Sequence, residues 1–106
     1  MQFRISSLKL RKSKFILRRV VGESMLPTLK PGELLLGINT KRIKPRDIVI
    51  VNHNGLDKVK RVQKVNKDSV YILGDNLKSS SDSRDFGYID RSKILARVIW
   101  PIFVDL

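Results

Sequence analysis

The sequence predicts an all-β fold, a small coiled barrel or sandwich of short antiparallel strands with no transmembrane helix. Three observations support this prediction. Apolar runs are short and rich in Val and Ile, turn residues separate them about every 8 to 12 residues, and the only helical turn we expect lies at 90–93. The chain has 106 residues, of which 42% are hydrophobic, so it can bury one core.

The first half of the chain contains three expected strands. The first covers 15–21, where two apolar runs flank a charged pair, and the second, 34–36, follows the turn Pro31-Gly32. The clearest buried strand is 47–51, because its apolar residues are continuous and β-branched. It is followed by Asn54-Gly55, the pair favoured in tight hairpins, which predicts a hairpin with the next strand.

The second half alternates strands with one long polar stretch. The segment 58–65 is rich in β-branched residues and places Lys60 and Arg61 on opposite faces of a strand. The expected elements in chain order are a strand at 58–65, a strand at 70–73, a polar loop at 74–87, and a strand at 94–100 that Pro101 ends. Trp100 is expected at the edge of the core.

Charge divides the chain into a basic arm at 1–14 and a single folded domain at 15–106. The chain has 22 Lys and Arg against 10 Asp and Glu, a formal net charge of +12. Such an excess indicates an anionic partner, which is nucleic acid, an acidic membrane surface or an acidic protein. We interpret the arm as a solvated strand and tail; the alternative is peripheral contact with an anionic membrane or with an acidic substrate.

Several functions are excluded by what the sequence lacks. The chain contains no cysteine, which excludes disulfides and thiol catalysis. No cluster of His, Asp and Glu has metal-ligand spacing, so we expect neither a metal nor another cofactor. No apolar run is long enough for a membrane span or a secretory signal. We therefore expect a cytoplasmic protein.

Ser24 interrupts the strand pattern between Gly22 and Pro27. A sharp turn there would expose the hydroxyl and let backbone N–H groups face a carbonyl oxygen. A serine hydroxyl is a poor nucleophile until a base removes its proton. The alternative is a plain turn with a solvated serine.

Lys60 lies between Val59 and Arg61-Val62 in an expected strand. If the side chain faces inward, burial penalises its ammonium and lowers its pKa. At the reference pKa of about 10.4, fewer than about one lysine in a thousand is neutral at pH 7, and a base needs a far larger fraction. The alternative is one solvated lysine among many.

The segment 74–87 is dense in short polar side chains that can shape an irregular loop. A hydroxyl from it could orient the Lys60 amine, and an Asp82–Arg84 pair could brace it. The alternative is a flexible serine-rich surface loop. His53, the sole histidine, is expected in a hairpin turn, so a Ser–His–Asp triad through it is the weaker hypothesis.

Together these segments resemble the sequence boxes of type I signal peptidases over residues 20–101. The resemblance rests on Gly22-Glu23-Ser24-Met25-Leu26-Pro27-Thr28-Leu29, Pro45-Arg46-Asp47-Ile48-Val49, Lys60-Arg61-Val62, and Gly74-Asp75-Asn76 with Ser80, Asp82, Ser83, Arg84 and Phe86-Gly87. It implies a serine endopeptidase that uses a Ser–Lys dyad to remove an N-terminal leader or extension from a precursor protein.

The resemblance also implies a role for each matching residue. Ser24 would attack the scissile carbonyl and Lys60 would be the general base, held by Ser80. Asp82 and Arg84 would brace the loop, with Asp75 and Asn76 packed beside it. The oxyanion hole and substrate cleft would involve Gly22, Glu23, Met25, Leu26 and Pro27, with the Ser24 N–H as an oxyanion donor.

The chain departs from typical members of that family in two ways. They carry membrane helices before the serine box and a Gly-x-Pro-Gly-Asp turn, often with an inserted β-domain, after the Lys-Arg box. Here 63–68 runs directly to the next strand. The chain looks most like the short soluble proteases associated with maturation of nickel-type superoxide dismutase, which are thought to trim an N-terminal extension.

Three other interpretations remain. One is a conventional signal peptidase core that cleaves secretory precursors. Another is the self-cleaving repressor family, which shares the dyad but carries a DNA-binding domain and a cleavable linker for which this chain has little room. The third, of a different class, is a small basic β-barrel that binds nucleic acid. Aromatic residues, at 7%, are too few for stacking platforms, so no nucleic acid is expected.

Overall fold

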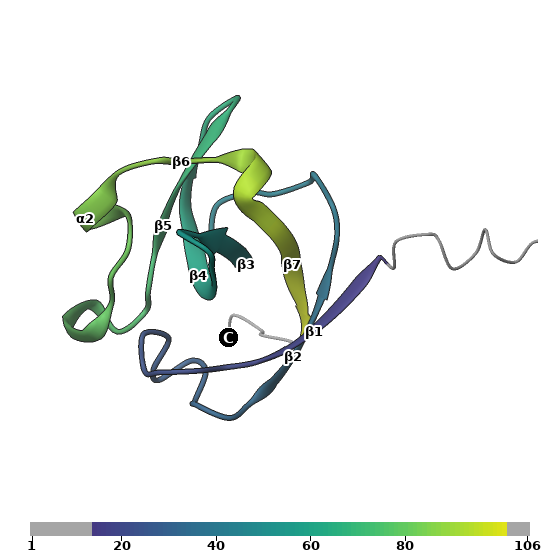
Figure 1. The fold of residues 1–106 in the computed structure, drawn as a ribbon, viewed down its shortest axis with the longest axis vertical. Coiled ribbons are helices and arrows are strands. Elements are labelled where there is room, and N and C mark those ends of the chain that lie inside the picture. The colour runs from purple at the N-terminus through teal and green to yellow at the C-terminus, as the bar shows by residue number, and fades with distance from the viewer. Residues whose placement is uncertain (1–13, 102–106) are drawn as a thin grey trace, which may run out of the picture.

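The computed structural model describes residues 14–101 and confirms the predicted all-β fold (Figure 1). Most of the basic arm expected at 1–14 therefore lies outside the described residues. Among the described residues, no helix is long and apolar enough to cross a membrane. The strands are β1 (Phe15–Arg19), β2 (Leu34–Ile38), β3 (Ile48–His53), β4 (Leu56–Val65), β5 (Ser69–Leu73), β6 (Ile89–Asp90) and β7 (Ile94–Trp100).

All strand pairs are antiparallel, and the order across the sheet is β1-β2-β7-β3-β4-β5-β6. The sheet coils so that β1 and β5 lie on opposite sides of the molecule with β3 and β4 between them (Figure 1). The β3–β4 hairpin turns at Asn54 and Gly55, whose φ values are 54° and 79°. Positive φ at both positions is what the predicted Asn-Gly turn requires.

The coiling covers both faces of β3 with apolar side chains. Val49 and Val51 belong to one cluster, which also contains Val62, Val70 and Ile72. On the opposite face Ile48 belongs to a second cluster, whose other buried members are Val20, Met25, Leu29 and Leu35. Burial on both faces explains why 48–51 reads as a continuous apolar run rather than an alternating one.

The segment 74–87 is more regular than the loop predicted from the sequence. It contains the 3₁₀ turn η1 (Leu77–Ser79) and the short helix α2 (Ser83–Phe86). Asp82 caps α2 by accepting from the Arg84 N–H, and the Asp85 carboxylate accepts from the Asp82 N–H. This reciprocal capping box satisfies backbone donors and so turns a polar stretch into a helix. The helical turn expected at 90–93 is confirmed as η2 (Arg91–Lys93).

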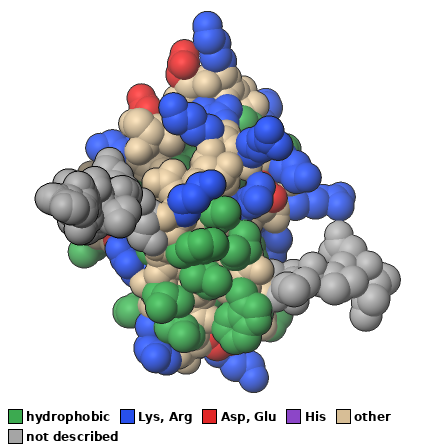
Figure 2. All heavy atoms as spheres, turned by 90° about the vertical axis from the view of Figure 1, so that its right-hand side faces the viewer, with side chains coloured by type: hydrophobic (Ala, Val, Ile, Leu, Met, Phe, Trp, Pro, Cys, Tyr) green, Lys and Arg blue, Asp and Glu red, His purple; other side chains and the backbone are tan. Residues whose placement is uncertain are grey.

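One face of the sheet carries exposed apolar side chains, and the prediction that Trp100 packs at the core edge is wrong. Trp100 is 53% exposed and lies opposite Leu36, which in turn lies opposite Leu17 of β1. Figure 2 shows apolar side chains gathered on this side of the molecule, bordered by Lys and Arg. We call this surface the apolar face; it comprises Phe15, Leu17, Leu34, Leu36, Ile38 and Trp100.

Candidate active site

Ser24 lies in the connection between β1 and β2, and buried side chains fix that connection. The chain turns at Gly22, whose φ is +80°, and then makes two tight turns in which Leu26 N–H donates to Glu23 O and Leu29 N–H donates to Met25 O. Met25 and Leu29 are 1% and 0% exposed and anchor the turns in the second core cluster. Ser24 itself is half-buried.

Asn76 pins the backbone around Ser24. Its N–H donates to Ser24 O at 2.8 Å, and its side-chain Nδ2 donates to Glu23 O at 3.1 Å. Both carbonyls are therefore occupied, whereas the Ser24 N–H has no acceptor within residues 14–101. That N–H is available to a carbonyl oxygen brought to Ser24.

Gly74 allows the serine turn and the 74–87 segment to approach each other. A Cβ at this position would lie 2.6 Å from Ser24 O and 2.2 Å from Ser80 Oγ, closer than real Cβ contacts. The Gly74 N–H also donates to Asp82 Oδ2 at 2.9 Å. Gly74 belongs to the Gly74-Asp75-Asn76 motif, but no local pattern predicts its role, because its partners are distant in the sequence.

Lys60 faces the interior, as the sequence analysis expected of a base, and only 4% of it is exposed. Its Nζ donates to Ser80 Oγ at 3.1 Å. Burial lowers the pKa of Lys60, and the positive charges of Lys58 and Arg84 lower it further, whereas the negative charge of Asp82 opposes the shift. The alternative of a solvated lysine is wrong.

Ser80 stands between Lys60 and the buried carboxylate of Asp82. The Ser80 hydroxyl donates to Asp82 Oδ2 at 2.7 Å, so its oxygen accepts from Lys60. Asp82 is 0% exposed and also accepts from Arg84 Nε at 2.9 Å. Burial alone would raise the pKa of Asp82, but hydrogen bonds from Arg84, Gly74 and Ser80 outweigh burial and hold that pKa well below its usual range.

Asp75 ties the serine turn to β4 through two partners. Arg61 donates to it from Nε and Nη2, both at 2.8 Å, and Thr28 Oγ1 donates at 2.5 Å. Burial would raise the pKa of Asp75, but Arg61 and Thr28 outweigh it and lower the pKa. The roles of Thr28 and Arg61 were not predicted from the sequence; strand alternation indicated only that Arg61 points away from the Lys60 side.

Ser24 and Lys60 line one pocket of about 420 Å³. No hydrogen bond joins their side chains, and catalytic hydrogen bonds are often long before a substrate binds. Of the five residues expected in the oxyanion hole or cleft, only Met25 lines the pocket; Gly22, Glu23, Leu26 and Pro27 do not. The lining residues are Arg18, Arg19, Val20, Val21, Ser24, Met25, Ile50, Leu56, Asp57, Lys58, Val59, Lys60 and Ser81.

Two unpaired strand edges flank this pocket. β1 pairs only with β2, and β4 pairs with β5 only from Arg61 onward, so the other edge of residues 56–60 is free among the described strands. Both β1 and 56–60 contribute lining residues. An unpaired edge offers backbone N–H and C=O groups to an extended peptide.

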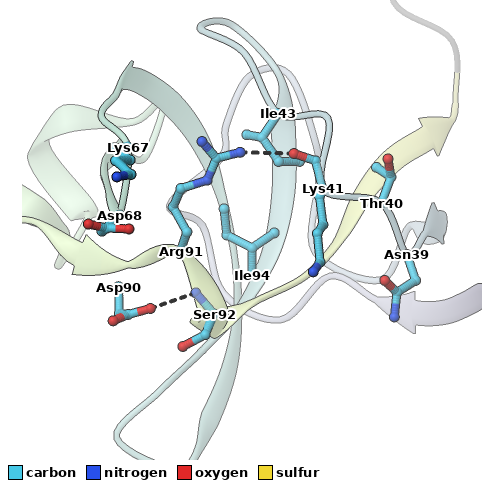
Figure 3. Close-up of a pocket in the computed structure, with 10 residues that line it drawn as sticks. All are labelled: Asn39, Thr40, Lys41, Ile43, Lys67, Asp68, Asp90, Arg91, Ser92 and Ile94. Carbon is cyan, nitrogen blue, oxygen red and sulfur yellow. Dashed lines mark hydrogen bonds between the residues drawn. The ribbon is translucent and has the colours of Figure 1, made fainter.

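Two other features do not form an equivalent site. His53 ends β3 and stacks on Phe86 at 4.1 Å, with Lys58 Nζ 3.4 Å from its Nδ1. Among residues 14–101 its side chain has no hydrogen bond to Ser24 or to a carboxylate. A pocket of about 550 Å³ near Ile94 is crossed by Arg91, which donates to Lys41 O (Figure 3). Arg91 also donates to Asn66 O. Arg91 therefore connects two loops.

In the part of the chain that the structure describes, no group of three or more His, Cys, Asp or Glu could hold a metal.

A family model for Peptidase S24-like proteins matches residues 1–99. The match covers nearly the whole chain, including both Ser24 and Lys60. No curated protein matches the chain.

The close approach at Gly74 predicts the effect of a single methyl group. Gly74→Ala forces Ser24 O and Ser80 Oγ away from their positions, and we expect the free energy of unfolding in urea to fall by about 1 to 3 kcal/mol. Backbone amide shifts of Ser24 and Ser80 in NMR spectra should move with it. Gly55→Ala is the control, since its Cβ would meet nothing within 4 Å and only its positive φ is strained. Unchanged shifts at Ser24 in Gly74→Ala would contradict the prediction.

Proposed function

The chain belongs to the Peptidase S24-like family, and on that premise we propose that it is a serine endopeptidase with Ser24 as nucleophile and Lys60 as general base. The observation that carries the proposal is the burial of Lys60, 4% exposed, in the pocket that Ser24 also lines. A perturbed titratable group in a cleft beside a potential nucleophile is typical of a catalytic pair.

The proposed reaction is acyl transfer followed by hydrolysis. Neutral Lys60 accepts the proton of the Ser24 hydroxyl as Oγ attacks the scissile carbonyl, and the resulting ammonium then protonates the leaving amine. Because Ser80 accepts an N–H bond from Lys60, the amine keeps a fixed direction while its lone pair stays available for the proton. Water then hydrolyses the acyl-enzyme.

Backbone donors supply the proposed oxyanion hole. The Ser24 N–H has no acceptor in residues 14–101 and would donate to the developing oxyanion. Gly22 carries no hydroxyl to add a second donor. The hydrogen bonds from Asn76 support this role, because they hold the Ser24 backbone in place before the substrate arrives.

The proposed substrate is an extended segment of a precursor protein. It would lie between β1 and residues 56–60, pairing with their free edges as an added strand. The sequence resemblance supports removal of an N-terminal leader or extension, in particular maturation of nickel-type superoxide dismutase. A conventional signal peptidase core, acting on secretory precursors, would use the same cleft.

The family match favours one further candidate, cleavage of the chain by itself. The Peptidase S24-like family supports an autoprotease as well as an enzyme that acts on other proteins. The same residues would perform both reactions, so the two candidates differ only in which chain supplies the peptide.

We also propose contact with an anionic membrane. Nearly all of the basic arm at 1–14 lies outside the described residues. The apolar face, which is described, supports the same partner. It is edged by Arg19, opposite Leu34, and by Arg97, opposite Ile38. Exposed Trp and Phe beside basic residues suit the interface of an anionic bilayer.

Peptide cleavage tests the proposed dyad. Wild type should cut at least one of two precursor peptides, a nickel superoxide dismutase N-terminal extension or a secretory signal sequence, as seen by mass spectrometry. Ser24→Ala and Lys60→Ala should each lower the rate by at least about a thousandfold, since neither residue acts without the other. Lys64→Ala, an exposed lysine on the same strand, is the control.

The outcomes separate the candidates. The peptide that is cut chooses between maturation protease and signal peptidase. Cutting of the chain itself, at a rate independent of its concentration and with added peptides left intact, would favour self-cleavage. Activity that survives in Lys60→Ala would exclude Lys60 as the base.

The pH dependence of kcat/KM should report the lysine. The lowered pKa of Lys60 puts its neutral, active form at lower pH than for an ordinary lysine, so the rate should rise with pH through that pKa and then level off. Lys58→Met removes a positive charge that lowers the pKa, so the rising limb should move to higher pH. A rate that is flat between about pH 6 and 9 would rule out this mechanism.

Vesicle co-sedimentation tests the membrane proposal. Wild type should bind phosphatidylcholine vesicles that contain phosphatidylglycerol, and Leu17→Glu should weaken binding about tenfold, because it puts a carboxylate on the apolar face. Leu77→Glu is the control, since Leu77 is exposed to a similar extent, 56% against 58%, but lies elsewhere. Equal losses in both variants would show that charge alone, rather than the apolar face, drives binding.

A further inference from the structure

The pocket shared by Ser24 and Lys60 carries an unbalanced positive charge. Apart from Lys60, its charged lining residues among positions 14–101 are three cations, Arg18, Arg19 and Lys58, and one carboxylate, Asp57. The remaining lining is largely apolar, which reduces the screening of charge by water. A peptide that enters the pocket therefore meets an excess of positive charge.

The three cations differ in the groups that they already contact within the protein. Arg18 Nε is paired with Asp57 Oδ2 at 2.9 Å, so this pair is neutral as a unit. Arg19 donates from Nη1 to Gly32 O at 2.6 Å. Lys58 has no carboxylate partner among residues 14–101.

Within the described residues, the side-chain contacts of Lys58 are with two aromatic rings that carry no negative charge. Its Nζ lies 3.4 Å from His53 Nδ1 and 5.5 Å from the centre of the Phe86 ring. Neither contact neutralises the ammonium, whose side chain is half-buried. Arg19 also lacks a carboxylate partner among residues 14–101, but it is exposed to solvent, so Lys58 is the half-buried lining cation without a counter-charge.

The spacing between Lys58 and Lys60 determines which position of a bound peptide each lysine would face. The two residues are two apart on β4 and lie opposite Val51 and Val49 of β3, so they share one face of the strand. Two residues of strand span about 7 Å, which also separates alternate side chains of an extended peptide. Both lysines lie on the free edge at 56–60, where the peptide would pair.

We propose that the cleft selects peptides with an acidic side chain two or three residues from the scissile bond, and that Lys58 is the residue that determines this specificity. The inference rests on the proposed peptidase function. The acidic side chain supplies the counter-charge that Lys58 lacks, and a basic side chain at the same position is repelled. Apolar and small side chains elsewhere in the peptide face Met25, Ile50 and Val59.

Binding to a chain that cannot cut tests the specificity separately from catalysis. The probes are ten-residue peptides, identical except for Asp, Asn or Lys at one position, with that position scanned along the peptide. They are titrated into ¹⁵N-labelled Ser24→Ala protein, and the dissociation constants are taken from amide shifts of residues 56–60. At the favoured position we expect the Asp peptide to bind about three- to tenfold more tightly than the Asn peptide, and the Lys peptide more weakly than both.

Charge reversal distinguishes Lys58 from the net charge of the protein. Lys58→Glu, made in the Ser24→Ala chain, should invert the preference so that the Lys peptide binds best, and Lys58→Gln should abolish it. Lys64→Glu changes the same net charge on the same strand outside the pocket and should leave the preference intact. The ¹⁵N spectra show at once whether each variant is folded.

Three results would overturn the inference: equal dissociation constants for Asp and Asn peptides at every position, an effect of Lys64→Glu as large as that of Lys58→Glu, or no peptide-induced shift around Lys58. None of them bears on cleavage by wild type. Conversely, acidic peptides that bind preferentially and are never cut by wild type would leave the cleft specificity standing while the peptidase proposal fails.

Discussion

The hydrogen bond between Lys60 Nζ and Ser80 Oγ is the contact on which the site depends. A buried ammonium normally needs a carboxylate beside it, and a direct ion pair would keep the lysine charged. Here the carboxylate of Asp82 lies one hydroxyl away, and Ser80 accepts from Lys60 while it donates to Asp82. The amine is thus oriented without a direct ion pair, and burial remains the largest influence on its pKa, which it lowers.

Asp82 can perform this function because it is itself fixed from several sides. Gly74, Ser80 and Arg84 all donate to its carboxylate, and the same carboxylate caps α2. The cost of burying a charge is offset by these hydrogen bonds. The Asp75–Arg61–Thr28 contacts and the two bonds from Asn76 then tie the serine turn to the same frame. The pocket forms where the two edges left unpaired by the coiled sheet face this frame.

The sequence predicted six of the seven described strands, because each of these carries a local signal, whereas the two-residue strand β6 was not predicted. The Asn54-Gly55 turn, the apolar run of β3 and the β-branched content of β4 are signals carried by neighbouring residues, and the turn and both strands are confirmed. It failed where partners are distant or where burial is decided by the rest of the fold. Trp100 was expected at the edge of the core, yet the sheet leaves its face uncovered. The Asp82–Asp85 capping box is a local signal for α2, but the sequence prediction for 74–87 was a loop without a helix.

The sequence by itself determined which groups are present: a serine in a turn, a lysine in an apolar strand and a polar segment that contains Ser80 and Asp82. It also indicated that Lys60 and Arg61 point to opposite faces, because alternation along a strand is a local property. Only the tertiary structure decided that Lys60 is buried, that Ser80 separates it from Asp82 and that Gly74 must lack a side chain. These features depend on contacts between segments up to about 50 residues apart, such as Ser24 and Asn76, which no local pattern encodes.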